Sequence, residues 1–186
     1  MLPLWLMTPL NTVGRGYTAR KFSLFSLTAG IIFTGLHYTL QLYLVKKVKT
    51  RHLFWFSIVT LIVFLSNMPS LLRLEDDLEF MILCSVFHAI ILTSIGGINT
   101  SVHIMIRSTM SQEGVKFGIA IFQVLAGALD GISSLIVGHL FAYSVEYSKR
   151  YPEHSTYPIN HYSAFLYLSL IYLLMLIPVN FVKDSQ

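Results

Sequence analysis

The amino-acid sequence predicts an all-α membrane protein, a polytopic bundle of about five transmembrane helices. Hydrophobic residues make up 54% of the 186 positions and charged residues only 12%, about half the charged share of an ordinary soluble domain. The mean hydropathy is +0.65. The apolar residues gather in five runs long enough to span a bilayer: 22–45, 53–72, 80–106, 117–145 and 162–182. Among the aspartates, glutamates, lysines and arginines, only Asp130 lies inside a run.

The formal net charge of +4 does not indicate a nucleic-acid partner, because the basic residues lie in loops between apolar runs, where they orient helices. The expected partner is therefore the lipid bilayer. Residues 46–52, 107–116 and 183–186 hold seven lysines and arginines in 21 positions, against six in the 44 positions of the other side. This density favours a cytosolic location for the first set, and leaves open which membrane holds the protein.

The chain divides into an N-terminal segment, 1–21, and the bundle, 22–186. The first ten residues are apolar but too few to span a bilayer, and Pro3 and Pro9 interrupt them. We interpret them as an interfacial segment or as the remnant of a preceding helix. A polar loop follows them.

The first run carries a polar face whose members are spaced three or four residues apart, as one side of a helix requires. This face consists of Ser23, Ser26, Gly30, Thr34, His37 and Gln41. His37 and Gln41 are one helical turn apart, and they either pack through hydrogen bonds or line a polar pathway. The second run has fewer polar residues, and Pro69 predicts a kink at its end.

The third run has a similar face of small and polar residues, and His88 and Asn99 lie beside it. The face consists of Ser85, Ala89, Thr93, Gly96, Thr100 and His103. The Gly96-Gly97 pair predicts a weak point, where a break would expose backbone carbonyls to a cavity. Cys84 and His88 are spaced for one helical face but lack a third ligand, so we expect no metal site and interpret Cys84 as a packing residue.

The fourth run carries the one charge in the apolar part of the sequence. A charged side chain at the centre of a span costs about 2.5–3.5 kcal/mol, so Asp130 is expected to face protein or water. It belongs to a face formed by Ala120, Gln123, Gly127, Asp130, Ser134 and Gly138. Gly127, Gly131, Ser134 and Gly138 are small enough to let another helix approach closely. The fifth run is apolar on nearly every side, which predicts a peripheral helix.

Two segments carry a family resemblance: GVKFGIAIFQVLAGALDGISSLIVGHLFAYS, and after it HYSAFLYLSLIYLLMLIPV. They resemble the last two helices of a major facilitator superfamily transporter in the glycines along the first helix and the tyrosine-containing entry into the second. The five runs then resemble helices eight to twelve, and the chain resembles the C-terminal half of that fold. The resemblance implies that the first, third and fourth runs line a central cavity. The loop at 45–52 lacks the Gly and Asp of the family's loop signature.

The function we expect is transport of a small solute, by a half-size or truncated transporter with a polar cavity at mid-depth. Substrate or proton coupling would involve Asp130, Gln123, His37, Gln41, His88 and Asn99. Five helices alone do not close a two-sided pathway, so a second chain, a homo-oligomer or a missing half would complete it. The alternative is a non-transporting membrane protein that assembles a partner through its small-residue faces. We expect no enzyme activity and no cofactor, since a single acid lies within the runs.

Overall fold

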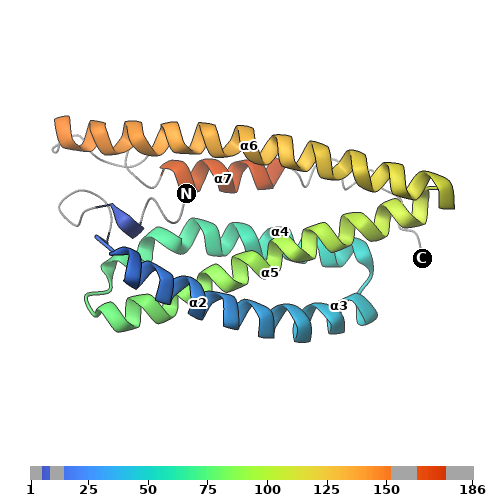
Figure 1. Cartoon of the computed structure of the whole chain (residues 1–186), viewed down its shortest axis with the longest axis horizontal. Coiled ribbons are helices and arrows are strands. Elements are labelled where there is room, and N and C mark those ends of the chain that lie inside the picture. The colour runs from blue at the N-terminus through green and yellow to red at the C-terminus, as the bar shows by residue number, and fades with distance from the viewer. Residues whose placement is uncertain (1–5, 9–14, 152–162, 175–186) are drawn as a thin grey trace.

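The computed structural model describes residues 6–8, 15–151 and 163–174, and all regular structure in these ranges is helical. In chain order the elements are α2 Ala19–Leu36, η1 His37–Gln41, α3 Leu42–Lys47, α4 Thr50–Asn67, η2 Met68–Arg73, α5 Asp77–Thr109, α6 Gln112–Arg150 and α7 Ser163–Leu174 (Figure 1). The all-α prediction is confirmed. Of the N-terminal segment 1–21, only residues 6–8 and 15–21 lie inside the described ranges.

Four stretches of helix are long and apolar enough to cross a bilayer. They are Ala19–Lys47, Thr50–Leu71, Asp77–Thr109 and Gln112–Tyr147, and they coincide with the first four predicted runs. The protein is thus a multi-pass integral membrane protein. The fifth predicted run, 162–182, is represented by α7, which has 12 residues, and its remaining positions, 162 and 175–182, lie outside the described residues.

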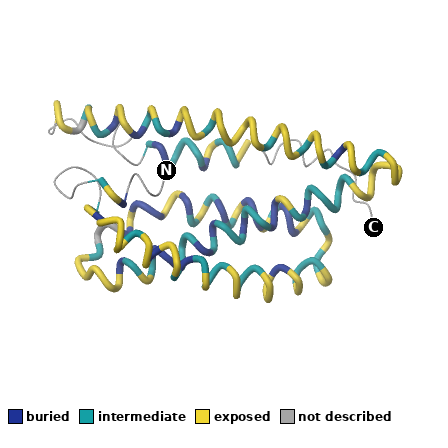
Figure 2. The backbone as a smooth tube through the Cα atoms, in the orientation of Figure 1, coloured by how far each residue is buried: buried dark blue, intermediate teal, exposed yellow. Residues whose placement is uncertain are grey.

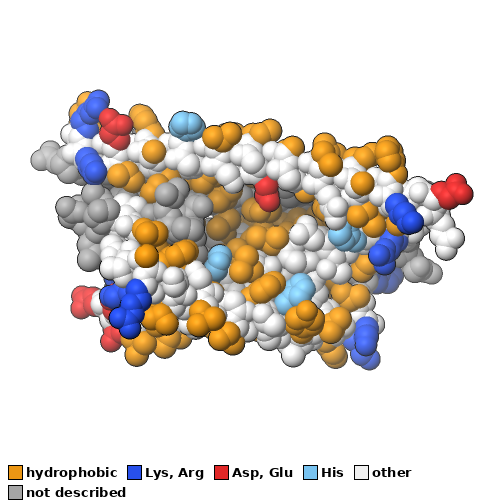
Figure 3. Space-filling model, in the orientation of Figure 1, with side chains coloured by type: hydrophobic (Ala, Val, Ile, Leu, Met, Phe, Trp, Pro, Cys, Tyr) orange, Lys and Arg blue, Asp and Glu red, His pale blue; other side chains and the backbone are white. Residues whose placement is uncertain are grey.

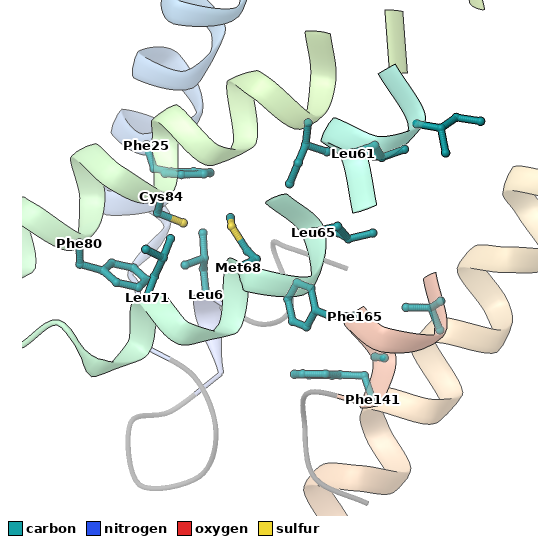
Figure 4. Close-up of a cluster of buried hydrophobic side chains, with 14 of the residues drawn as sticks. Leu6, Phe25, Leu61, Leu65, Met68, Leu71, Phe80, Cys84, Phe141 and Phe165 are labelled. Atoms are coloured by element: carbon teal, nitrogen blue, oxygen red, sulfur yellow. The ribbon is translucent and has the colours of Figure 1, made fainter. Parts of the chain in front are cut away.

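The helices form two groups: α2, η1, α3 and α4 pack with α5, and α6 and α7 form the second group. Figure 1 shows α2, η1 and α3 running beside α5 and α4, while α6 and α7 lie together on the other side of α4 and α5. α5 packs along both α2 and α4, and α7 packs between α4 and α6. The core follows this arrangement: Phe25, Phe80, Cys84 and Met68 meet where α2, η2 and α5 converge, whereas Phe165 joins the core from α7 (Figure 4).

The helices begin and end where local chemistry allows. Thr18, Asp76 and Ser111 accept hydrogen bonds from the first-turn amides of α2, α5 and α6, which satisfies donors that a helix leaves unpaired. At the end of α4 the chain tightens into the 3₁₀ helix η2, which contains Pro69 near its start. At the position of the kink predicted at Pro69, the chain therefore changes from an α-helix to a 3₁₀ helix.

The expected break at Gly96-Gly97 is wrong, because α5 is continuous from Asp77 to Thr109. The glycines instead let neighbouring helices approach. A Cβ at Gly96 would lie 2.7 Å from Cε1 of His37, and a Cβ at Gly97 would collide with Oγ of Ser57. Packing against α2–η1 on one side and α4 on the other offsets the low helix propensity of this pair.

A cluster of charged and aromatic side chains ties the entry of α2 to the first turn of α5. Lys21 Nζ lies 2.6 Å from Asp77 Oδ2, and Arg15 Nε lies 3.4 Å from Asp77 Oδ1. The Arg15 guanidinium also stacks 4.4 Å from the centre of the Phe80 ring, and Tyr17 meets that ring edge-on. We call Arg15, Tyr17, Lys21, Asp77 and Phe80 the N-terminal clasp. α5 has 33 residues, which is about 50 Å of helix against a hydrocarbon core of about 30 Å, so its ends extend beyond the core. Asp77 is the first residue of α5, and Lys21 lies in the first turn of α2, before the apolar runs that start at residues 80 and 22, so these charges lie outside the hydrocarbon.

Gly97→Ala is expected to destabilise the protein by about 1–3 kcal/mol, because the new methyl group forces Ser57 and α4 away from α5. Gly30→Ala is the matched control, since a Cβ there meets nothing within 4 Å and alanine favours the helix. Thermal unfolding in detergent measures both variants. Equal losses in the two variants would contradict the packing role of Gly97.

The N-terminal clasp predicts a pH dependence. The hydrogen bond from Lys21 lowers the pKa of Asp77 below its ordinary value of 3.8. The stabilisation is therefore fully present above about pH 4 and is lost as the pH falls through the lowered pKa. It is expected to stay below about 1 kcal/mol because the pair is exposed and screened.

The measurement is the difference in unfolding free energy between wild type and Asp77→Asn, taken from pH 6 to pH 2.5. This difference should shrink at the acid end and also in 1 M salt. Glu79→Gln, in the same turn of α5, is the control that should show no such trend. A difference that is independent of pH would rule out the ion pair as its source.

Candidate functional site

The first candidate site is a polar junction between α2 and α5, built on a local irregularity. The chain passes from α2 to α3 through a π-helical turn, His37–Gln41, a geometry that is frequent at functional sites. Gln41 is buried and donates from Nε2 to Oγ1 of Thr100, at 2.8 Å. The hydrogen bond joins two helices at a depth where water does not compete.

Three buried polar side-chain atoms have no hydrogen-bond partner among the described residues: Nδ1 of His37 and Oε1 of Gln41 at this junction, and Nε2 of His103, whose ring packs against Phe122 of α6. The first two face α5 at Gly96, where a Cβ would lie 2.9 Å from Nδ1 and 3.3 Å from Oε1. An unpaired buried polar atom costs about 1–3 kcal/mol. The polarity of this junction thus exceeds what helix packing requires.

Beside the junction a groove of about 410 Å³ runs between α2–η1–α3 and α4, with α5 as its floor. We call it the Gly97 groove. Its walls are mainly aliphatic and aromatic, and its polar residues are Gln41, Ser57, Thr60, Thr93 and Ser94. A mostly apolar pocket with a few polar groups is the usual form of a small-molecule site.

The structure brings together only two of the six residues predicted to couple substrate or protons, namely His37 and Gln41. His88 is half-buried and stacks on Phe25 of α2, with ring centres 5.7 Å apart. Asn99, three residues after Gly96 in α5, is exposed. Gln123 and Asp130 of α6 are exposed as well and lie on a separate helix.

The second candidate site is the open face of α6, and α2 carries open glycines as well. None of the residues in the most apolar window of α6 is buried, and Figure 2 shows this helix exposed along most of its length. Added Cβ atoms would meet nothing within 4 Å at five glycines of the two helices: Gly30, Gly35, Gly127, Gly131 and Gly138. The predicted packing residues of α6 therefore contact no other described helix at these positions, and Ser134 is exposed beside them.

Asp130 lies halfway along α6 and is exposed, and it forms no ion pair with another described residue. It is close enough to the Tyr172 hydroxyl of α7 for an electrostatic interaction. Figure 3 shows lysines and arginines gathered at the two ends of the long axis, with apolar side chains between them and a hollow below α6. This distribution matches a bilayer whose hydrocarbon surrounds the middle of the molecule.

Sequence reasoning missed Ser57 as a site residue, because α4 has few polar positions and no spacing rule links it to α5. Thr100 could be found from its place on the polar face of the third run. The π-helical turn that positions Gln41 leaves no signal in the residue pattern, since HYTLQ carries neither proline nor glycine.

A scan against protein-family models, a search of the curated proteins and a search of the solved structures each found no match to this chain. The structure by itself supports a multi-pass helical membrane protein with four long apolar helices.

Proposed function

We propose that the protein is one side of a membrane transporter for a small solute, resembling the C-terminal half of a major facilitator superfamily protein. The observation that carries this proposal is the position of Asp130. An ionisable side chain lies at the midpoint of an apolar helix, where it is exposed and has no ion-pair partner among the described residues. In hydrocarbon such a residue is costly, so it faces a water-filled cavity or another protein surface.

The chemistry available to Asp130 is proton uptake or pairing with a cation. A carboxylate in a poorly solvated site is costly unless a proton or a positive group accompanies it. A solute that carries an amine, or a proton that moves with a neutral solute, meets this requirement. Gln123 lies two helical turns away, about 10 Å along α6, and adds a hydrogen-bonding group to the same side.

The other wall of the pathway comes from a second chain, a second copy or a further part of a longer protein. The open glycines of α2 and α6 are suited to contact it, because helices approach most closely where side chains are absent. Alternating access then corresponds to rocking of this half against the other around the site at mid-depth.

Asp130→Asn is expected to reduce solute-driven proton movement at least about tenfold. The reason is that an amide side chain neither binds a proton near neutral pH nor forms an ion pair with a cation. The measurement uses membrane vesicles from cells that make the protein, so that any partner chain is present. The vesicles contain a pH-sensitive dye and are exposed in turn to a panel of amines, amino acids and sugars.

Glu113→Gln is the matched control, because Glu113 is an exposed acid in the first turn of the same helix. It should leave transport unchanged. Transport by Asp130→Asn at the wild-type rate would remove Asp130 from the mechanism and with it the main support for the proposal.

The second candidate function is assembly with a partner protein without transport. It is favoured by the open space at Gly127, Gly131 and Gly138, which accepts a tightly packed helix from another chain. This function and transport both require the face of α6 to be covered, and they differ in whether Asp130 is needed for solute movement.

Gly131→Leu is expected to weaken association of the chain with its partner or with a second copy, because the side chain fills the space a close helix needs. Energy transfer between labelled copies in nanodiscs, and co-purification from native membranes, measure the association. Gly114→Leu, in the partly exposed first turn of α6 before the apolar run, is the control. Association that is equally strong in both variants would contradict a role for the glycine face.

A further inference from the structure

The Gly97 groove contains no charged or histidine side chain among its lining residues. On its α2 side it extends from Ile32 to Leu44, about 18 Å of helix. Its volume of about 410 Å³ lies within the range of small-molecule sites. Leu40 and Phe56 line the groove and are largely exposed, so its mouth opens toward the hydrocarbon of the bilayer.

The inner part of the groove has two polar groups whose hydrogen-bonding capacity is unused. Ser57 is 4% exposed and its hydroxyl forms no hydrogen bond with another described residue, although Oγ lies against Gly97. The Gln41 amide, 3.9 Å from the Cβ position of Gly97, uses Nε2 for Thr100 and leaves Oε1 unpartnered.

The other hydroxyls on the α5 side are already engaged. Thr93 donates to the carbonyl of Ala89 at 2.8 Å, and Ser94 donates to that of Ile90 at 2.9 Å. Two hydroxyls on the α4 side remain without a hydrogen bond to another described residue, that of Ser57 beside Gly97 and that of Thr60, and the Gln41 carbonyl oxygen is unpartnered where it faces Gly96. A ligand hydroxyl matches these groups, since it donates one hydrogen bond and accepts others.

The apolar walls of the groove determine the charge and polarity that the rest of the ligand can have. A charged ligand would bury its charge without a counter-charge, at a cost far above any hydrogen bond made here. A polar, uncharged solute such as a sugar would leave most of its hydroxyls unpaired against aliphatic walls. Only a molecule that is mainly hydrocarbon fills the groove without either penalty.

We propose that the Gly97 groove binds a neutral amphiphile from the bilayer, a long hydrocarbon body with a single hydroxyl group that hydrogen-bonds at Ser57 and Gln41. Because Oε1 of Gln41 faces Gly96, its hydrogen bond to the ligand requires the Gln41 side chain to turn toward Gly97. The site lies apart from Asp130, which is on α6, so the inference does not depend on transport and holds for a transporting or a non-transporting protein.

The test uses a long-chain alcohol that carries a photoreactive diazirine, with the methyl ether and the carboxylic acid of the same chain as comparison probes. The full-length protein in nanodiscs is irradiated with each probe, and labelled peptides are identified by mass spectrometry. The alcohol should label peptides that contain Phe56 or Ile90, and unlabelled alcohol should compete. The ether and the acid should label these peptides about three- to tenfold less, as expected for the loss of a hydrogen bond or the burial of a charge.

Two pairs of variants distinguish labelling inside the groove from labelling of the lipid-exposed surface. Ile90→Trp fills the groove and should abolish labelling by the alcohol, whereas Ile82→Trp, on an exposed part of α5, should not change it. Ser57→Ala should reduce labelling by the alcohol about threefold or more, and also labelling by the ether, because the ether oxygen still accepts a hydrogen bond from Ser57 in wild type. Ser66→Ala is its control, because the Ser66 hydroxyl donates to the Ile62 carbonyl within α4.

Circular dichroism and thermal unfolding establish that each variant is folded before its labelling is measured. The comparison of the three probes uses the wild-type protein and does not depend on any variant. Equal labelling by alcohol, ether and acid overturns the proposal. So does labelling that survives Ile90→Trp, because the probe would then report ordinary lipid contact. Absence of specific labelling in wild type also overturns it and indicates that another segment or chain occupies the groove.

Discussion

The close approach of α2 and α4 to α5 at Gly96 and Gly97 is the contact on which the rest of the structure depends. Without side chains at these two positions, the π-helical turn of α2 and Ser57 of α4 lie directly on the α5 backbone. Inside a bilayer helices gain little from apolar burial alone, because lipid tails are as apolar as leucine. Contact through small residues and an interhelical hydrogen bond, here from Gln41 to Thr100, replaces that driving force.

Eight of the described helical glycines fall into two groups with opposite surroundings. One group consists of Gly96, Gly97 and Gly118, which are enclosed by side chains of neighbouring segments. Those segments can pack this closely because glycine has no Cβ. Five others, on α2 and α6, face open space. Glycine weakens a helix by about 1 kcal/mol relative to alanine, and the enclosed group offsets that cost by packing. The open group has no such compensation within the described chain, which is the physical basis for expecting a further protein surface against α2 and α6.

Much of the fold could be predicted from hydropathy, because a bilayer imposes a length on apolar runs and confines charge to their ends. Four runs became long helices for this reason. The break at Gly96-Gly97 was predicted wrongly, since propensity describes an isolated helix and tertiary packing overrides it. The shared face of His37 and Gln41 followed from their spacing, but their unpartnered atoms depend on a π-helical turn and on the neighbouring helix. Ser57 could not be predicted as a site residue because its role comes from a contact between helices that are distant in the sequence.

The two candidate sites differ in what they ask of a ligand, and this difference follows from their electrostatics. Asp130 brings a full charge to mid-depth on an open helix face, so its occupant has to supply a proton, a cation or water. The Gly97 groove offers only neutral dipoles inside an apolar wall, so its occupant has to be neutral and mainly hydrocarbon. The groove lies between α2, α4 and α5, whereas Asp130 belongs to α6, which packs on α7 and on one end of α5. An amphiphile in the groove would therefore act on the packing of α2 against α4 and α5, and Asp130 on α6 would act independently of it.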